Sequence, residues 1–275
     1  LPESEPHLWN YCEAPLLEMM PNPPNAFYNL YLHEALQATA EMFRLDNDPD
    51  TAEYYEKTAT ELGCKLETTF FQKDKGCLYA DHFNDKGQPE CFHGHIQMLF
   101  LERGLVPIEK RQRLLAGFLL GELEMPALGA LPYLIRAFMQ YATPEERLLF
   151  HYKLKAVYDI MIKAGTKTWW EVLNGKEYGG GAGSLCHGWS AGISYYESSY
   201  LLGVTPLEPG FRKFSVKPYP GDVKQASGNI HTSRGLIRIS WECRDNKTII
   251  LTVKAPKGCT PVIESYPEYS VTLRG

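Results

Sequence analysis

The sequence lacks the features that mark membrane-spanning or nucleic-acid-binding chains. No apolar run reaches the roughly 18 residues that cross a bilayer, because Glu, Arg, Lys or Gly interrupts each candidate. The net charge of -5 gives no electrostatic basis for binding nucleic acid or an anionic membrane surface. We therefore expect a soluble globular protein.

Paired cysteines are also missing. The seven cysteines are an odd number, lie far apart and include no Cys-x-x-Cys pair, which argues against a disulfide framework and against a structural zinc site. Free thiols slightly favour a reducing compartment such as the cytoplasm. His93-Gly94-His95 is a poor metal pair, since residues two apart on a helix face different sides. His82 beside Asp81 is expected to be a surface turn.

From Asn25 to about residue 202 the sequence shows helical periodicity. Apolar residues at i, i+3 and i+4 predict a helix from Asn25, and Asp48-Pro49 supplies the cap and first-turn proline of a second, antiparallel one. Thr143-Pro144-Glu145-Glu146 predicts a capping-box start. Other helices are expected near 90–103, 107–120, 127–141 and 187–202. The expected buried faces include Leu32, Leu36 and Met42 on the first helix, and Leu149, Tyr152, Ala156, Val157 and Ile160 on the capping-box helix.

After Gly203 the pattern changes to short alternating runs punctuated by prolines. Runs over 211–217, 223–232, 236–241 and 248–253, with turns at 233–235 and 244–247, predict an antiparallel β-sandwich. Helical hairpins in series indicate a bundle, a solenoid or an α/α toroid, and no fixed-period repeat is present. We therefore predict a mainly α domain over 1–203 and an all-β module over 204–275 that carries no acid or histidine cluster.

One stretch combines residues suited to sugar chemistry. Thr168-Trp169-Trp170-Glu171 is followed by a glycine-rich run and then by Ser184-Leu185-Cys186-His187-Gly188-Trp189-Ser190-Ala191-Gly192. Aromatic rings cover the apolar faces of a pyranose, and a carboxylate among them can act as a general base. The alternative is that the two tryptophans belong to the core and that the glutamate is a solvated or capping residue.

A second aromatic cluster that ends in a carboxylate lies near the amino terminus. It is Trp9-Asn10-Tyr11-Cys12-Glu13, in a proline-rich and irregular stretch. A loop packed on the helices through its aromatic rings is the alternative interpretation.

Taken together, four segments resemble the carboxy-terminal half of the bacterial α-L-rhamnosidases, glycoside hydrolase family seventy-eight. They are residues 9–13, 165–171, 184–192 and the Gly-x-x-Pro-x-x-Pro-Gly-Phe join within 202–211. The order and spacing of these segments match over nearly the whole chain.

The resemblance implies a partial (α/α)6 toroid followed by a β-sandwich, and inverting cleavage of terminal α-L-rhamnosides with no metal and no cofactor. Glu171 matches the general base and His187 the histidine near the bound sugar. The residues expected to line the pocket are Trp9, Glu13, Trp169 and Trp170. The indole walls would suit the rhamnose methyl group.

One departure from the family pattern affects the expected activity. In the family, the general acid lies upstream of the region where this chain begins, and neither Asp46 to Asp50 nor Glu122-Leu123-Glu124 matches it. About seven expected helices cannot close a toroid of about twelve, and the chain starts at Leu1 without an initiator methionine. We therefore expect a fragment that is inactive alone and that pairs with the missing amino-terminal half or with a second copy.

Three other interpretations remain open at the level of sequence. A different α/α-toroid enzyme, such as a glucuronyl hydrolase, lyase or phosphorylase, would use other residues near the base; Tyr178 and His187 keep a lyase open. A non-catalytic carbohydrate-binding protein would retain the pocket without the acid. An all-helical interaction protein would use Trp169 and Trp170 only as core.

Overall fold

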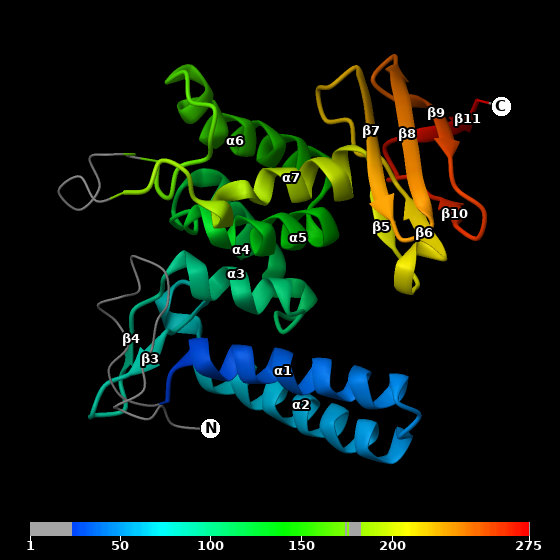
Figure 1. Cartoon of the computed structure of the whole chain (residues 1–275). Helices are drawn as coiled ribbons and strands as arrows, with labels where there is room; N and C mark the ends of the chain where they lie inside the picture. Colours follow the sequence, from blue (N-terminus) through cyan, green and yellow to red (C-terminus); the bar gives the residue numbers. More distant parts are fainter. Residues whose placement is uncertain (1–23, 174, 176–182, 275) are drawn as a thin grey trace. The chain divides into compact units, whose positions relative to one another are not determined.

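The computed structural model describes residues 24–173, 175 and 183–274 of the 275-residue chain (Figure 1). The chain divides into two compact units, one ending at Tyr141 and the other beginning at Ala142. No helix among the described residues is long and apolar enough to span a membrane. The second unit holds helices as well as strands, and the domain boundary expected at 204 stays a prediction.

The first unit opens with the expected helical hairpin of α1 (Ala26–Leu45) and α2 (Pro49–Phe70). The Asn25 side chain accepts a hydrogen bond from the Tyr28 backbone N–H at 2.9 Å, and Asp48 accepts one from Thr51 at 3.1 Å. These bonds satisfy amide groups that a helix start leaves free. The cap predicted at Asp48 is confirmed, and the structure adds a second cap at Asn25.

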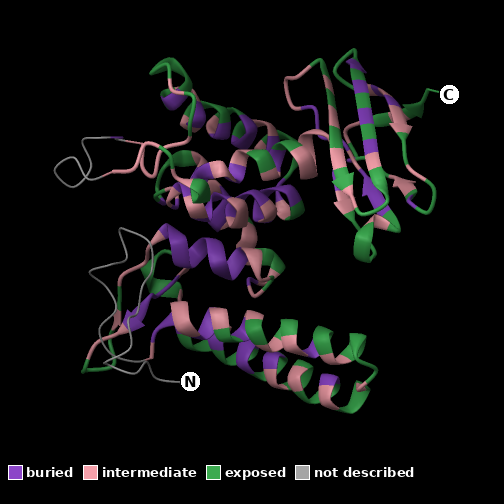
Figure 2. Cartoon of the chain, viewed as in Figure 1, coloured by how far each residue is buried: buried purple, intermediate pink, exposed green. Residues whose placement is uncertain are grey.

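Two short β-hairpins lead from α2 into the centre of this unit. Strand β1 (Phe71–Gln72) pairs with β2 (Leu78–Tyr79), and β3 (His82–Phe83) pairs with β4 (Pro89–Glu90). The helices that follow are α3 (Gly94–Glu102), α4 (Ile108–Leu120) and α5 (Leu131–Tyr141). Helix α3 is buried from its first residue to Leu101, so the rest of the unit packs around it (Figure 2).

His95, in the first turn of α3, makes the first unit sensitive to acid. Its imidazole is buried, its Nε2 meets no hydrogen-bond partner among the described residues, and the Phe27 ring lies 6.0 Å away. Burial lowers the pKa of His95 to about 4, whereas an unfolded histidine titrates near 6.5. The depressed pKa contributes stability that is present above about pH 6.5 and is lost as the pH falls towards 4.

We predict that His95→Phe removes this acid sensitivity. The wild-type chain should lose about 3 kcal/mol of unfolding free energy through this group between pH 7 and pH 4, and the variant should not. Urea denaturation of both chains at the two pH values measures the difference. An equal loss of stability in both chains would contradict this account of His95.

The second unit begins with α6 (Pro144–Lys163), whose predicted capping box is confirmed. The Thr143 hydroxyl accepts from the Glu146 backbone N–H at 3.3 Å, and the Glu146 carboxylate accepts from the Thr143 N–H at 2.8 Å. The last helical segment consists of a 3-10 turn (Gly188–Ala191), α7 (Gly192–Tyr196) and a π turn (Glu197–Leu201). This agrees with the helix expected over 187–202.

The buried face predicted for α6 is wrong. Leu149 is 56% exposed, and Tyr152 and Ile160 are also exposed, whereas Arg147 and His151 are buried. Arg147 donates to both oxygens of Glu268, and His151 bonds the Tyr196 hydroxyl and Asp222 at 2.8 and 2.7 Å. Burial of a polar side chain costs little when its hydrogen bonds are satisfied, so these two polar residues share the inner face with Phe150, Leu154, Tyr158 and Met161.

The predicted face of α1 is wrong for a related reason. Met42 is 69% exposed, while Asn29 and His33 are buried. The Asn29 side chain donates to the Asn25 carbonyl at 2.9 Å. A methyl group added at Gly63 of α2 would lie 3.2 Å from the His33 ring, so this glycine makes room for the imidazole.

Two sheets form the β module. A four-stranded sheet has the order β11-β9-β8-β7 and a three-stranded sheet has the order β10-β6-β5. The strands are β5 (Val204–Pro206), β6 (Lys213–Val216), β7 (Gln225–Thr232), β8 (Gly235–Arg244), β9 (Thr248–Lys254), β10 (Thr260–Ile263) and β11 (Ser270–Leu273). Phe214 and Val216 of one sheet share a core with Ile237, Trp241 and Leu251 of the other.

The prediction that these sheets are antiparallel is only partly correct. Strand β10 pairs in parallel with β6, and β11 pairs in parallel with β9. Parallel pairing requires a crossover connection, and here the chain leaves β9 for the other sheet before it returns to β9 as β11. Both sheets are therefore mixed. The sequence did not predict the parallel pairs, because β10 and β11 lie beyond the alternating runs that it shows.

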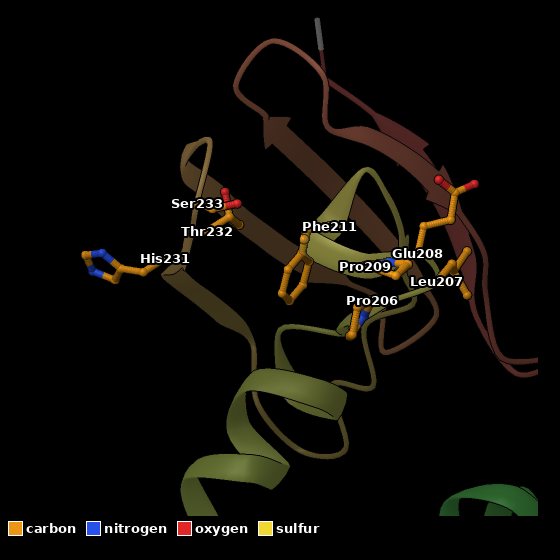
Figure 3. Close-up of a pocket in the computed structure, with 9 residues that line it drawn as sticks. Pro206, Leu207, Glu208, Pro209, Phe211, His231, Thr232 and Ser233 are labelled. Carbon is orange, nitrogen blue, oxygen red and sulfur yellow. The ribbon is translucent and has the colours of Figure 1, made fainter. Parts of the chain in front are cut away.

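The Pro-x-x-Pro-Gly-Phe join forms one side of a shallow hollow within the β module (Figure 3). Residues 206–211 and 231–233 line it. Phe211 has a backbone φ of 57° and its ring lies 6.3 Å from the ring of Phe214, while His231 points away from Phe211. The hollow contains none of the residues predicted for the sugar site.

Candidate functional site

The two stretches predicted to form the site lie against each other as an antiparallel pair within the second unit. The Glu171 backbone N–H donates to the Ser184 carbonyl at 2.8 Å, and the His187 N–H donates to the Trp169 carbonyl at 2.8 Å. The Thr168 hydroxyl donates to the Leu185 carbonyl at 2.5 Å. These bonds fix the chain at Glu171 and over the three residues before it.

One oxygen of the Glu171 carboxylate is positioned by the backbone. Glu171 Oε2 accepts a hydrogen bond from the Ser184 N–H at 2.9 Å and lies 3.8 Å from His187 Nδ1. The Glu171 side chain is 27% exposed and that of His187 is 30% exposed. The carboxylate is thus held in place and remains accessible to a water molecule, which are two requirements of a general base.

The two indoles beside Glu171 are half-buried, so neither is only a core residue. The Trp169 ring stands edge-on to the Tyr158 ring at 5.2 Å, and the Tyr158 hydroxyl donates to the Ser190 carbonyl at 2.9 Å. Trp170 Nε1 donates to the Thr166 hydroxyl at 3.2 Å. Packing and hydrogen bonds fix each ring while part of its surface stays open.

His187 is oriented from two sides. Its backbone caps the 3-10 turn that starts at Gly188, and its ring lies 4.2 Å from the ring of Trp189 with a tilt of 47°. Together with the contact to Glu171, this gives an imidazole, a carboxylate and a partly exposed indole on adjoining loops. Such a group can hydrogen-bond sugar hydroxyls and stack on a sugar ring.

The remaining predicted site residues, Trp9 and Glu13, lie outside the described residues. No group of three or more His, Cys, Asp or Glu side chains in the described part of the chain is arranged to hold a metal ion.

Sequence reasoning missed one polar pair in the first unit. Asp81 and His82, expected on a surface turn, are both buried, and Asp81 contacts His93. The β3–β4 hairpin brings these positions together. The sequence offers one local signal of this contact. Asp81 lies twelve residues before His93-Gly94, which opens the apolar helix α3.

Comparison with known proteins identifies the family. Residues 18–200 match the bacterial α-L-rhamnosidase six-hairpin glycosidase domain, which is more than half of the chain, and residues 203–264 match the bacterial α-L-rhamnosidase C-terminal domain. The chain belongs to the bacterial α-L-rhamnosidase family. The predicted family relationship is therefore confirmed, and residues 18–200 match a glycosidase domain.

Individual rhamnosidases agree with this assignment. An α-L-rhamnosidase of Formosa agariphila is 29% identical over 119 residues, which are 41% of this chain and 13% of that protein. A GH78 rhamnosidase of Bacillus sp. GL1 superposes on 90% of the chain with a TM-score of 0.78 at 20% identity. The α-L-rhamnosidase of Streptomyces avermitilis, solved in complex with L-rhamnose, superposes on 86% with a TM-score of 0.70 at 18% identity.

These superpositions establish the fold of the chain. The chain covers only 27% and 23% of the two solved enzymes, about a quarter of their length. The helices and mixed sheets described above correspond to the shared region. A closed toroid is not formed by the described residues, which contain seven α-helices.

Proposed function

We propose that this rhamnosidase chain supplies the general base and part of the sugar pocket for inverting hydrolysis of terminal α-L-rhamnosides. The observation that carries the proposal is Glu171, whose carboxylate is positioned by the Ser184 N–H and remains partly exposed beside His187. The similarity to an enzyme solved with L-rhamnose supports the choice of sugar.

In this mechanism Glu171 takes a proton from a water molecule while the water oxygen bonds to the anomeric carbon. The bond from the anomeric carbon to the leaving oxygen breaks, and a general acid protonates that oxygen. Base and acid carboxyl groups in inverting glycosidases stand roughly 6.5 to 9.5 Å apart, which leaves room for the water. We propose that the acid comes from the part of the enzyme outside the region matched here, so the chain alone is inactive.

The indoles and the imidazole would hold the sugar. Trp169 and Trp170 offer partly exposed ring surface to the apolar edge of rhamnose, including its methyl group. His187, fixed by its backbone bond to Trp169, would hydrogen-bond a ring hydroxyl. We also propose that Trp9 and Glu13 line the sugar pocket, as the resemblance to the rhamnosidases predicts.

Sugar binding by the 275-residue chain tests this arrangement. We expect L-rhamnose to bind about four times more tightly than L-lyxose, which has the same hydroxyl configuration without the methyl group, because a buried methyl contributes about 0.8 kcal/mol. Trp170→Leu should abolish this preference, and Glu171→Gln should leave it intact. Calorimetric titration of the three chains measures it.

Equal binding of the two sugars by all three chains would remove the support for a rhamnose pocket. Binding that persists in Glu171→Gln, without turnover after the upstream half is added back to the wild-type chain, would instead favour a carbohydrate-binding protein that has lost catalysis.

A further inference from the structure

The first unit carries a second carboxylate–imidazole pair that the proposed hydrolysis does not use. Asp81 Oδ2 lies 2.7 Å from His93 Nδ1, and Asp81 Oδ1 accepts a hydrogen bond from the His93 backbone N–H at 3.0 Å. The Asp81 side chain is 6% exposed, whereas that of His93 is 23% exposed. A buried carboxylate therefore fixes both the backbone and the ring of a histidine that still reaches solvent.

The surrounding backbone holds Asp81 in place. Its N–H donates to the Cys91 carbonyl at 2.9 Å, and its carbonyl accepts from the Ala26 N–H at 2.7 Å. The His93 residue then caps helix α3, which is buried along nearly its whole length. The pair is thus tied to α1, to the β3–β4 hairpin and to the central helix of the unit.

This geometry sets the chemistry of His93. With Nδ1 directed at Asp81, Nε2 lies on the opposite edge of the ring. The hydrogen bond to Asp81 raises the pKa of His93, and the charge of Glu124 adds to the effect, while partial burial opposes it. A histidine whose Nδ1 is held by a carboxylate presents Nε2 as an oriented hydrogen-bonding atom.

A second carboxylate stands beside the pair. Glu124 is exposed, and its Oε1 accepts a hydrogen bond from the Gly94 N–H at 2.8 Å. A methyl group added at Gly94 would lie 2.2 Å from the Glu124 carbonyl oxygen, so only glycine permits this approach. Nearby, His82 Nε2 lies 3.4 Å from the exposed Glu90 carboxylate, and burial raises the pKa of the Cys91 thiol, which keeps it protonated.

In each unit a histidine with a carboxylate beside it opens a helical segment. His93-Gly94 and His187-Gly188 each open a helical segment, and each histidine has a carboxylate from an upstream limb near its Nδ1, at 2.7 Å for Asp81 and 3.8 Å for Glu171. In the second unit this arrangement belongs to the proposed sugar site. The first unit therefore resembles the second in this carboxylate–imidazole contact, which is a hydrogen bond only in the first unit.

We propose that Asp81, His93 and Glu124 form a binding site for adjacent hydroxyl groups of a neutral sugar. His93 Nε2 contacts one hydroxyl, the Glu124 carboxylate accepts from its neighbour, and Asp81 positions the imidazole. The ligand class rests on the proposed function, while the site itself consists of residues of the first unit alone.

Histidine-selective NMR of the full 275-residue chain, labelled with ¹³C and ¹⁵N in its imidazoles, tests the proposal with methyl α-L-rhamnoside as the probe. We expect the ring signals of His93 to shift on titration and the affinity read from that site to fall about tenfold in Glu124→Gln. His231→Gln, in the β module, is the matched control and should leave the titration unchanged. His93 signals that do not respond to saturating sugar would overturn the proposal.

Asp81→Asn separates positioning from folding. The asparagine oxygen can still accept from the His93 backbone, but its amide cannot accept from Nδ1–H, so we expect the ¹⁵N shifts of neutral His93 to show the proton moved to Nε2 and the affinity to fall. Native shifts of the ring of His33, which is buried in the first unit, verify the fold of that unit. An unchanged tautomer and affinity in this folded variant would contradict the role of Asp81.

The signals of the two histidines distinguish this proposal from the proposed function. Shifts at His187 without shifts at His93 would support the hydrolase site and overturn the second site. Shifts at His93 alone would support the second site and count against the Glu171 pocket. No shift at either ring would contradict both.

Discussion

Replacing Glu171 with glutamine should lower kcat for p-nitrophenyl α-L-rhamnoside by about 10³-fold, with KM changed less than about threefold. The assay uses the chain mixed with a polypeptide that carries the upstream half of the catalytic domain. Glutamine can still accept the Ser184 N–H bond that holds the carboxylate at 2.9 Å, but it cannot take a proton from water. General-base contributions lie between about 10² and 10⁴.

Glu208→Gln supplies the control for this substitution. Glu208 is an exposed carboxylate at the join to the β module, and its loss should leave kcat within about twofold of wild type. Retention of more than a tenth of the wild-type kcat by Glu171→Gln would show that another group activates the water.

Gly203→Ala should produce a large loss of stability from a single methyl group. Gly203 has a φ of 78°, and an added Cβ would lie 2.3 Å from both the Lys217 carbonyl carbon and the Pro218 nitrogen. The Gly203 carbonyl also accepts from the Lys217 N–H at 2.8 Å, which sets the start of the β5–β6 pairing. A side chain can relieve such a contact by changing its rotamer, but backbone atoms cannot, so strands β5 and β6 must separate.

Gly165→Ala is the matched control, because Gly165 has a φ of 75° and an added Cβ there meets nothing within 4 Å. We expect about 1 kcal/mol of destabilisation at Gly165 from the left-handed backbone alone. At Gly203 we expect roughly 1–3 kcal/mol more from overpacking. Urea denaturation of the two variants measures the difference, and equal losses would contradict the packing argument.

Local signals predicted the parts of the fold that depend on neighbouring residues. Asp48 and Thr143 each begin a helix with the expected side-chain bond, because a cap and its amide lie within three residues. The alternating run over 236–241 falls inside β8, where residues 237, 239 and 241 are buried in turn.

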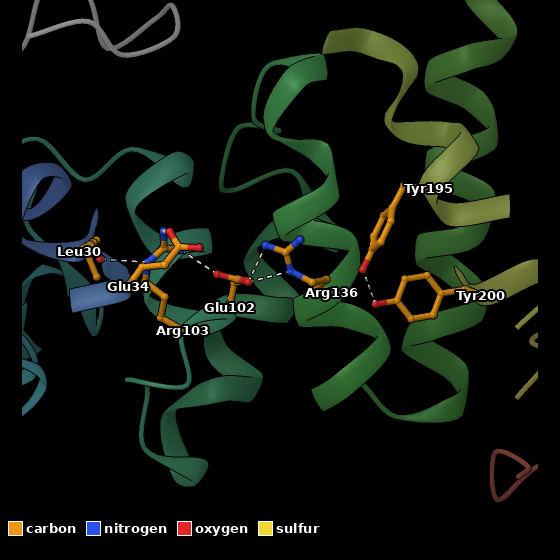
Figure 4. A network of polar contacts seen from close by, with 7 residues as sticks. All are labelled: Leu30, Glu34, Glu102, Arg103, Arg136, Tyr195 and Tyr200. Carbon is orange, nitrogen blue, oxygen red and sulfur yellow. Dashed lines mark hydrogen bonds and ion pairs between the residues drawn. The ribbon is translucent and has the colours of Figure 1, made fainter. Parts of the chain in front are cut away.

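Contacts between distant segments account for what the sequence did not predict. In the first unit, the buried Arg103 side chain donates to the Leu30 carbonyl and pairs with Glu34 and Glu102, which in turn binds Arg136 (Figure 4). Buried charges persist only when such partners are present. Helical periodicity carries no information about these partners, which is why the inner faces of α1 and α6 were predicted wrongly.

In the candidate site, too, the sequence predicted the residue types, whereas the contacts between distant segments are seen only in the structure. The residue types of Thr168-Trp169-Trp170-Glu171 indicated sugar chemistry, and the resemblance to rhamnosidases added the roles of Glu171 and His187. The antiparallel pairing that positions Glu171 joins residues 13 positions apart along the chain, and the Asp81–His93 contact joins residues 12 apart. Such pairings depend on how the loops fold back, so only the structure reveals them.

The most direct test of the central proposal is ¹H NMR of rhamnose as it is released from p-nitrophenyl α-L-rhamnoside. The chain alone, the upstream half alone and their mixture are compared. The proposal predicts release only from the mixture, with the β anomer of L-rhamnose appearing first and release slowed by about 10³-fold when the chain carries Glu171→Gln. Initial release of the α anomer, or no release from halves that demonstrably associate, would contradict the assignment of Glu171 as the base of an inverting rhamnosidase.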